Sequence, residues 1–461
     1  MTPAPNVPAP NVPAPNVPVP NVPVPNVPGP DIAGFLHDRL GLFIHFGLYA
    51  LAARHEWVQN VERIAAEEYA RYFEHFDPDL FDAADWARQC KRAGMRYAVL
   101  TTKHHEGFCL WDSAYTDYKI TNTPFGRDLV REFVDAFRAE GIKIGFYHSL
   151  LDWHHPDFTI DGHHPLRDRP DAAELNAGRD MARYRAYLHH QVRELLTSYG
   201  EISYLFYDFS YPEHLQPTIW GNKSSADWGS EELLAMTREL QPGIVINDRL
   251  GIPGDVVTPE QYQPAEPMRR PGGAARQDDS RGEPVAWEAC QTINGSWGYF
   301  RDNTMFKTPD LLIRMLVDGV SKGGNLLFNI GPTGRGSVDP ISAQTLAGLG
   351  TWMDLHGRSV IGAGPSDFVP PPDCRYTQRG DRLYLHLFAW PFEHVHLPGL
   401  AGAVEYAQLL NDASEVMFRV IDPDAPAHNI SMGGLPAGTL TLTLPVRQPP
   451  VAVPVVELFL R

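Results

Sequence analysis

The sequence is poor in cysteine and in positive charge. Its 461 residues include only four cysteines, Cys90, Cys109, Cys290 and Cys374, and no two of them have C-x-x-C spacing. A disulfide framework and a zinc site are therefore not indicated, and a reducing compartment is the simplest inference. The 56 Asp and Glu outnumber the 39 Lys and Arg, which gives a formal net charge of -17. Because nucleic acids and anionic membranes are polyanions, this charge argues against both as partners and favours a neutral ligand.

Long apolar runs are also missing. No uninterrupted run could span a bilayer, and Met1 is not followed by the basic and apolar segments of a signal peptide. The protein is therefore expected to be cytoplasmic. The alternative is a secreted protein whose signal peptide has been removed. Residues 3 to 30 instead repeat Pro-Ala/Val-Pro-Asn-Val with a period of five. Since proline removes backbone donors and fixes φ, residues 1 to 30 are predicted to be a disordered tether. Docking to a proline-recognising partner is the less favoured alternative.

From about Gly41 onward, predicted strands and helices alternate. Strands are predicted at 41–47, 97–101, 143–147, 204–208, 244–247, 287–290 and 325–330, and helices at 82–93, 128–140, 180–199, 230–240, 308–323 and 339–357. Seven or eight such alternations over about 320 residues predict an α/β fold, a (β/α)8-type (TIM-like) barrel over residues 31–358. Residues 251 to 285 are rich in Pro, Gly and charge, and are expected to form a long loop that closes over a site.

The pattern changes at about Ser359. Beyond it, short alternating strands such as 383–388 and 439–444 replace the helical period. Residues 359–461 are therefore predicted to form a separate all-β domain, a C-terminal sandwich.

Polar side chains follow or end several predicted strands. They are His45, Glu56, His104, His105, Asp208, Arg249 and Glu288. The carboxyl ends of barrel strands share one rim, so this clustering predicts a polar pocket there. Taken alone, Asp208 at the end of Tyr-Leu-Phe-Tyr-Asp could merely cap a turn, and the other polar residues favour a site instead. Interleaved aromatic residues, among them Trp57, Phe206 and Trp297, suit a sugar, which has one apolar face and a rim of hydroxyls.

Several motifs resemble those of glycoside hydrolase family 29, the α-L-fucosidases. They are Phe-Ile-His-Phe-Gly (43 to 47), Glu-Trp (56 to 57), Lys-His-His-Glu-Gly-Phe (103 to 108), Leu-Leu-Asp-Trp-His-His-Pro (150 to 156), Asn-Asp-Arg-Leu-Gly (247 to 251), Thr-Pro-Glu-Gln-Tyr (258 to 262), Trp-Glu-Ala-Cys-Gln-Thr-Ile-Asn (287 to 294) and Ser-Lys-Gly-Gly-Asn-Leu-Leu (321 to 327). The resemblance covers roughly residues 38 to 461, and several motifs in the same order make it specific.

The resemblance implies a retaining exo-glycosidase that removes terminal α-L-fucose through a covalent fucosyl-enzyme and needs no cofactor. Asp208 matches the family's nucleophile, and Glu288 matches a position assigned as acid/base in part of the family. Glu260, Glu266 and Glu56 remain candidates for the acid/base, because that role varies within the family. A retaining mechanism needs two carboxyl groups about 5 to 5.5 Å apart.

The resemblance also implies a set of sugar-binding residues. His45, His104, His105, Glu56, Trp57 and Arg249 resemble ligands of the fucose hydroxyls, and Tyr147 or His148 matches a second aromatic position. Phe206 lies where many relatives have tryptophan. Trp297 belongs to the same aromatic set. Phe209-Ser210 replaces the usual glycine after the nucleophile, which leaves the geometry of that turn open.

Other functions fit the sequence less well. His104 and His105 could be metal ligands or core residues, but neighbouring histidines of a strand point to opposite sides and no third ligand follows at standard spacing. A metal-dependent amidohydrolase would need a His-x-His pair at the first strand, and that pair is absent. A non-catalytic fucose-binding lectin on the same scaffold is the main alternative, and the presence of both candidate carboxylates argues against it.

Overall fold

The computed structural model describes residues 29 to 210, 222 to 269, 283 to 420 and 435 to 461. The predicted tether lies outside the described residues except for Gly29 and Pro30. The same holds for residues 270 to 282 of the predicted long loop.

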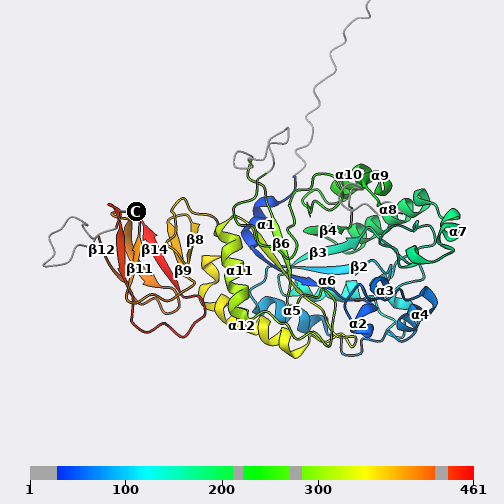
Figure 1. Ribbon diagram of the computed structural model, residues 1–461, viewed down its shortest axis with the longest axis horizontal. Coiled ribbons are helices and arrows are strands. Elements are labelled where there is room, and N and C mark those ends of the chain that lie inside the picture. Colours follow the sequence, from blue (N-terminus) through cyan, green and yellow to red (C-terminus); the bar gives the residue numbers. More distant parts are fainter. Residues whose placement is uncertain (1–28, 211–221, 270–282, 421–434) are drawn as a thin grey trace, which may run out of the picture.

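Seven parallel strands form the inner sheet of the larger part of the described chain (Figure 1). They are β1 (Leu40–Ile44), β2 (Tyr97–Lys103), β3 (Lys143–Ser149), β4 (Tyr204–Asp208), β5 (Val245–Ile246), β6 (Glu288–Thr292) and β7 (Asn325–Ile330). Their order across the sheet is β5-β4-β3-β2-β1-β7-β6. Almost all of their residues are buried, as expected for parallel strands that are covered on both faces. The predicted TIM-like barrel is confirmed.

Residues 256 to 260 close this barrel between β5 and β6. They make three parallel bridges, Asn247 with Val256, Val257 with Trp287 and Glu260 with Cys290. The segment therefore occupies the place of an eighth strand, within the region for which the sequence predicted only a loop. The bridges also bring Glu260 beside the middle of β6.

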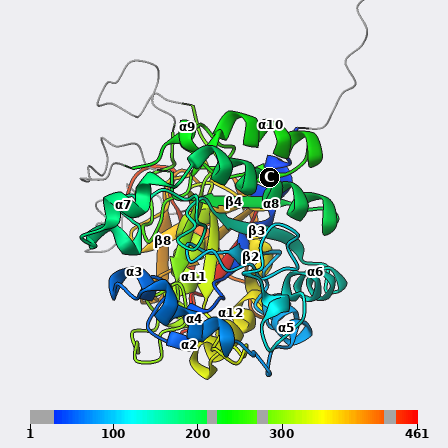
Figure 2. The same cartoon turned by 90° about the vertical axis from the view of Figure 1, so that its right-hand side faces the viewer.

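Helices surround the strands (Figure 2). The longer ones are α5 (Ala83–Arg92), α6 (Leu129–Ala139), α8 (Met181–Ser198), α10 (Ser230–Leu240), α11 (Pro309–Ser321) and α12 (Pro340–His356), and shorter ones are α2 (Tyr49–Ala52), α3 (Val58–Val61), α4 (Ala66–Glu74), α7 (Ala172–Ala177), α9 (Ser225–Trp228), η1 (Ile120–Asn122), η2 (Pro165–Asp168) and η4 (Gly357–Ser359). Asp82 and Asp128 cap α5 and α6 by accepting from backbone N–H groups three residues on. No helix in the described part of the chain is long and apolar enough to cross a membrane.

Helix α1 (Ile32–Asp38) closes the amino-terminal end of the barrel. The sequence predicted the first regular element at about Gly41, and the structure adds this helix before it. Phe35 of α1 packs against Tyr97 and Tyr204, which begin β2 and β4, with ring centroids 5.4 and 5.1 Å away. Aromatic rings therefore fill the interior of the barrel at this end.

Two antiparallel sheets follow the barrel. One has the order β10-β13-β12 and the other β11-β14-β9-β8. Their strands are β8 (Cys374–Arg379), β9 (Arg382–Leu387), β10 (His394–Leu397), β11 (Val404–Leu409), β12 (Met417–Val420), β13 (Leu440–Thr443) and β14 (Val455–Leu460). Leu385 and Leu458 of one sheet and Leu397 and Leu442 of the other belong to one apolar core. The division of the chain at Ser359 stays a prediction.

Candidate active site

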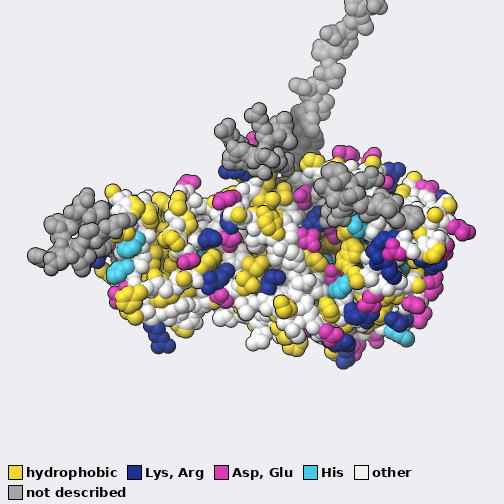
Figure 3. Space-filling model, viewed as in Figure 1, with side chains coloured by type: hydrophobic (Ala, Val, Ile, Leu, Met, Phe, Trp, Pro, Cys, Tyr) yellow, Lys and Arg dark blue, Asp and Glu magenta, His cyan; other side chains and the backbone are white. Residues whose placement is uncertain are grey.

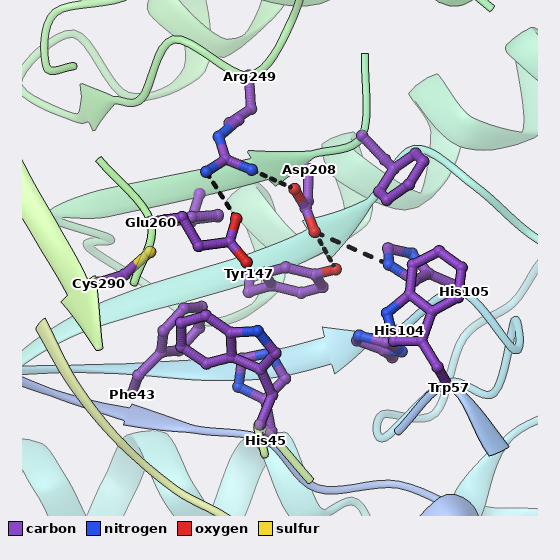
Figure 4. Close-up of a pocket in the computed structure, with 13 residues that line it drawn as sticks. Phe43, His45, Trp57, His104, His105, Tyr147, Asp208, Arg249, Glu260 and Cys290 are labelled. Carbon is purple, nitrogen blue, oxygen red and sulfur yellow. Dashed lines mark hydrogen bonds and ion pairs between the residues drawn. The ribbon is translucent and has the colours of Figure 1, made fainter. Parts of the chain in front are cut away.

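A cavity opens among the carboxyl ends of the barrel strands (Figure 4). It encloses about 490 Å³, open solvent at its mouth included. All the predicted site residues except Glu56 and Glu288 line it. The lining consists of Phe43, His45, Trp57, His104, His105, Tyr147, Phe206, Asp208, Phe209, Arg249, Glu260, Cys290 and Trp297. In barrels of this type, this end of the strands is where active sites lie.

Asp208, the last residue of β4, carries a carboxylate on the wall of the cavity. Tyr147 donates a hydrogen bond to its Oδ2 over 2.8 Å, and Arg249 Nη1 donates to its Oδ1 over 3.2 Å. His105 Nε2 lies 3.8 Å from Oδ2. Burial raises the pKa of Asp208 to about 6, although the charge of Arg249 opposes that rise. The group is therefore ionised above about pH 6 and remains open to the cavity.

Glu260 lies on the other side of the same guanidinium group. Arg249 Nη2 donates to Glu260 Oε2 over 2.8 Å, so one arginine bridges the carboxylates of Glu260 and Asp208. The Glu260 side chain is 38% exposed, compared with 16% for Asp208. Of the two carboxylates, Glu260 is thus nearer the solvent and Asp208 deeper in the site.

Glu288 does not reach this cavity, so the predicted placement of Glu288 on the rim is wrong. It is the first residue of β6 and pairs with Asn325, the first residue of β7, which places it near the closed end of the barrel. Tyr97 donates a hydrogen bond to its Oε2. The weak strand predicted at 287–290 gave no sign of which end of the barrel Glu288 would occupy. Because β6 continues to Thr292, the residue that reaches the cavity is Cys290.

Two other candidate carboxylates also lie outside the cavity lining. Glu56 is buried and accepts from the backbone N–H of Gly298 over 2.8 Å, next to Trp297 of the lining. It therefore supports the backbone beside Trp297 instead of lining the cavity as a ligand of the sugar. Glu266 is exposed on the segment that follows the bridges to β6.

Three histidines form one wall of the cavity. His104 and His105 both line it, although neighbouring residues of a strand were expected to point to opposite sides. The reason is that β2 ends at Lys103, so the two histidines lie in the turn beyond the strand. Burial lowers the pKa of His45 to about 3 and lowers those of His104 and His105 well below the usual value. All three imidazoles are therefore neutral near pH 7.

Aromatic rings form the apolar part of the lining and contact the histidines, with His45 stacked on Trp297 at 5.2 Å. Phe43 contacts Phe206 and Trp297 with ring centroids 5.2 and 5.8 Å apart, and Tyr147 stacks on Phe206 at 5.7 Å. Tyr147, not His148, occupies the second aromatic position. The two alternate along β3, and His148 points away from the cavity toward Thr102, which lies 3.1 Å from its Nδ1.

Phe209 follows the candidate nucleophile with a φ of 81°. This left-handed region favours glycine, so the turn keeps a glycine-type conformation with a phenylalanine in it. The ring lies 5.4 Å from that of Trp57 and 5.0 Å from that of His105. Strain of this kind persists where the surrounding packing holds it, and it gathers at functional sites.

The sequence interpretation missed three lining residues. Phe43 and Cys290 could have been found, because each lies two residues from a predicted site residue on the same face of a strand. Phe209 lies in a turn, where no such period applies. Among the described residues, no group of three or more His, Cys, Asp or Glu is arranged to hold a metal ion.

Known proteins resemble this chain over most of its length. The sequence model of the α-L-fucosidase family matches residues 31–358. The plasma α-L-fucosidase of Rattus norvegicus is 29% identical over 392 residues, 78% of each chain. Isoenzyme 1 of the α-L-fucosidase from Paenibacillus thiaminolyticus is 43% identical, with a TM-score of 0.84 over 93% of this chain and 98% of its own.

A family 29 α-L-fucosidase from Bacteroides thetaiotaomicron is 28% identical, with a TM-score of 0.76 over 97% of this chain and 100% of its own. That structure is a trapped covalent intermediate in complex with 2-fluoro-fucosyl fluoride. The family model covers well over half of the present sequence, and the solved relatives share its fold. The chain therefore belongs to the α-L-fucosidases of glycoside hydrolase family 29.

Proposed function

We propose that the protein is a retaining exo-glycosidase that hydrolyses terminal α-L-fucose from fucosylated glycans or glycosides. The observation that carries this proposal is the pair of carboxylates, Asp208 and Glu260, bridged by Arg249 across one cavity. Retaining glycosidases need two carboxyl groups that flank the scissile bond, one as nucleophile and one as acid and base.

In the first step, the Asp208 carboxylate attacks the anomeric carbon. A bond forms between an Asp208 oxygen and that carbon while the bond to the leaving oxygen breaks, and Glu260 gives its proton to the leaving oxygen. Asp208 suits the nucleophile because it is the deeper of the two and ionises at about pH 6. Glu260 suits the acid because its partly exposed side chain faces the side from which the leaving group departs.

In the second step, water replaces the leaving group. Glu260, now a carboxylate, takes a proton from water, whose oxygen bonds to the anomeric carbon as the bond to Asp208 breaks. The sugar leaves with its original configuration. Tyr147 and Arg249, which donate to the two Asp208 oxygens, stabilise the carboxylate as it departs.

Glu260 takes the acid/base role in this proposal and Glu288 does not. Glu288 lies on the same strand as Cys290 but two residues closer to the closed end, beside Tyr97. Cys290 lines the cavity and Glu288 does not, so Glu288 is not in position to protonate a leaving group bound there. The parallel bridge between Glu260 and Cys290, both of which line the cavity with Asp208, supports this choice.

The cavity also supports the choice of substrate. Phe43, Phe206 and Trp297 offer apolar faces to the C–H side of a sugar and to its methyl group, while histidines and carboxylates face its hydroxyls. Aromatic rings fill the barrel interior at the amino-terminal end, so a glycan chain cannot pass through the barrel. This favours a terminal sugar over an internal one as substrate. A net charge of -17 supports a neutral glycan over nucleic acid or an anionic membrane as partner.

The nucleophile is tested with 2-fluoro-fucosyl fluoride. Incubation should add one fluorofucosyl group, and peptide mass spectrometry should place it on Asp208. Asp208→Asn should lower kcat on an aryl α-L-fucoside by several orders of magnitude and prevent labelling. NMR of the first product formed should show the α-anomer. Fucose binding by the wild type without turnover would favour the lectin alternative, and labelling at another carboxylate would refute the assignment of Asp208.

The acid/base is tested by the dependence on the leaving group. Glu260→Gln should lose most activity on natural fucosyl linkages but keep the first step on activated aryl fucosides, because a good leaving group departs without a proton. The intermediate should then accumulate as a burst, and azide should speed its breakdown in Glu260→Ala. Glu288→Gln serves as the matched control and should keep the wild-type dependence on the leaving group. The opposite result would return the role to Glu288.

A further inference from the structure

Ser149, the last residue of β3, is buried behind His105 and does not line the cavity. Its Oγ lies 2.6 Å from His105 Nδ1 and donates to the carbonyl oxygen of Leu151 over 2.8 Å. A hydroxyl has one proton, and a carbonyl can only accept. Because that proton goes to Leu151, the contact with His105 requires the imidazole Nδ1 to be the donor.

Asn329 of β7 holds His45 in the same way. Asn329 Oδ1 lies 2.6 Å from His45 Nδ1, and Asn329 Nδ2 donates to the carbonyl oxygen of Trp297 over 2.7 Å. The second bond fixes which end of the amide is oxygen, and an amide oxygen only accepts. His45 Nδ1 must therefore carry the proton. Asn329, like Ser149, is fully buried and lies outside the cavity lining.

These two contacts determine what the imidazoles present to the cavity. Both rings are buried and neutral, so each has one proton, and that proton is on Nδ1. Nε2 of each ring is then a bare acceptor. For His105 this nitrogen lies 3.8 Å from Asp208 Oδ2, so two acceptors face each other at the nucleophile. A hydroxyl or water placed between them could donate to the nitrogen.

The strongest donors nearby are already engaged. The Tyr147 hydroxyl proton goes to Asp208, and Arg249 donates to both Asp208 and Glu260. The Nε2 atoms of His45 and His105 and the Asp208 carboxylate thus present mainly acceptors to the cavity. A hydroxyl-rich neutral sugar satisfies such a surface, whereas an acid or an O-alkylated sugar does not.

We propose that Ser149 and Asn329 are positioning residues that lock His105 and His45 as Nδ1–H tautomers, so that the cavity binds its ligand through hydroxyl groups that donate to Nε2. The choice of ligand rests on the proposed function, but the tautomers do not. Without Ser149, His105 is free to place its proton on Nε2 and donate it to Asp208. That bond would stabilise the carboxylate, lower its pKa and remove an acceptor for the sugar.

The chain offers a matched control in Thr102. Its Oγ1 donates to the carbonyl oxygen of Tyr147 over 2.8 Å and lies 3.1 Å from His148 Nδ1, which is the same arrangement. His148, however, points away from the cavity and does not line it. Thr102→Val therefore removes an equivalent hydroxyl from a buried histidine that should have no role in binding.

The experiment combines histidine tautomers with kinetics. In protein labelled with ¹⁵N-histidine and free of ligand, NMR at pH 7 should show protonated Nδ1 and bare Nε2 for His105 and His45, identified by the signals lost in His105→Gln and His45→Gln. Ser149→Ala and Asn329→Leu should change the tautomer of the ring they contact. Ser149→Thr and Asn329→Asp, which keep an acceptor, should retain it. A wild-type His105 with protonated Nε2 would overturn the proposal without any variant.

The kinetic readout separates positioning from stability. Ser149→Ala should raise KM for an aryl fucoside at least tenfold and move the acidic limb of kcat/KM to lower pH, while Thr102→Val changes neither. Ser149→Thr should restore both values. If Ser149→Ala alters only the melting temperature, the residue is merely structural. If the tautomers are as stated but no fucoside is turned over, the proposed function fails and the tautomer assignment stands.

Discussion

Replacing Glu288 with glutamine should make the folded protein more stable, and the gain should grow with pH. The Glu288 side chain is fully buried, its Oε2 accepts from Tyr97, and its Oε1 has no hydrogen-bond partner among the described residues. Burial raises the pKa of Glu288 from 4.5 to about 8, and the tyrosine contacts only reduce that rise. Since no cation among the described residues compensates the carboxylate, the folded protein favours the protonated form of Glu288.

The sign follows from where the proton is bound. Between about pH 4.5 and 8 the folded state holds a proton on Glu288 that the unfolded state has released. Stability is therefore lost as pH rises through that window, by about 1.4 kcal/mol per pH unit and on the order of 5 kcal/mol in total. Glutamine is neutral at every pH and similar in shape. Its oxygen can accept from Tyr97, and its amide can donate to the neighbouring Tyr204 hydroxyl.

The assay is thermal unfolding of the wild type and Glu288→Gln at pH 5 and pH 8. The variant's advantage in melting temperature should be on the order of 5 °C larger at pH 8 than at pH 5. Glu239→Gln, an exposed change on α10, controls for the loss of one surface charge. Equal melting temperatures at both pH values would refute the burial argument. A loss of activity in the folded variant would refute the view that Glu288 lies outside the catalytic machinery.

Three further predictions concern the site and the C-terminal sheets. The acidic limb of the wild-type pH profile of kcat/KM should lie near pH 6. Tyr147→Phe should move this limb to higher pH, because the Asp208 carboxylate loses a hydrogen-bond donor. A limb that stays in place would show that another group titrates. Phe209→Gly should be more stable than Phe209→Ala by about 1 kcal/mol, since only glycine relieves a φ of 81°, and both should raise KM by removing the ring that packs on Trp57. Equal stability of the two variants in denaturant unfolding would contradict the strain. Deleting residues 360 to 461 should cause aggregation, because Trp352 of the barrel donates to the carbonyl oxygen of Val453 and Asp318 pairs with Arg375. A barrel that is soluble in gel filtration and fully active would show that the barrel does not depend on these contacts.

The sequence was most informative where local rules decide the structure. Asp208 could be placed because a run of β-favouring residues ends in a single charge, and the helix caps at Asp82 and Asp128 follow from side chains that satisfy nearby N–H groups. Residues 256 to 260 could not be placed. Their pairing depends on the gap between β5 and β6, which only the closed barrel creates. The sequence therefore indicated a loop where the structure has a strand position, and it gave no sign that this position brings Glu260 to the cavity.

Glu288 and Asp208 show why a raised pKa does not by itself identify a catalytic group. Burial raises both values, and both carboxylates point into the interior of one barrel. What separates the two carboxyl groups is which residues surround each of them. Asp208 has Arg249 and a cavity in front of it, so its charge can form and be used at about pH 6. Glu288 has tyrosines and a plugged end, so it keeps its proton and contributes to packing. A carboxyl group in this fold becomes a candidate catalyst only where a cation can hold its charge and a ligand can reach it.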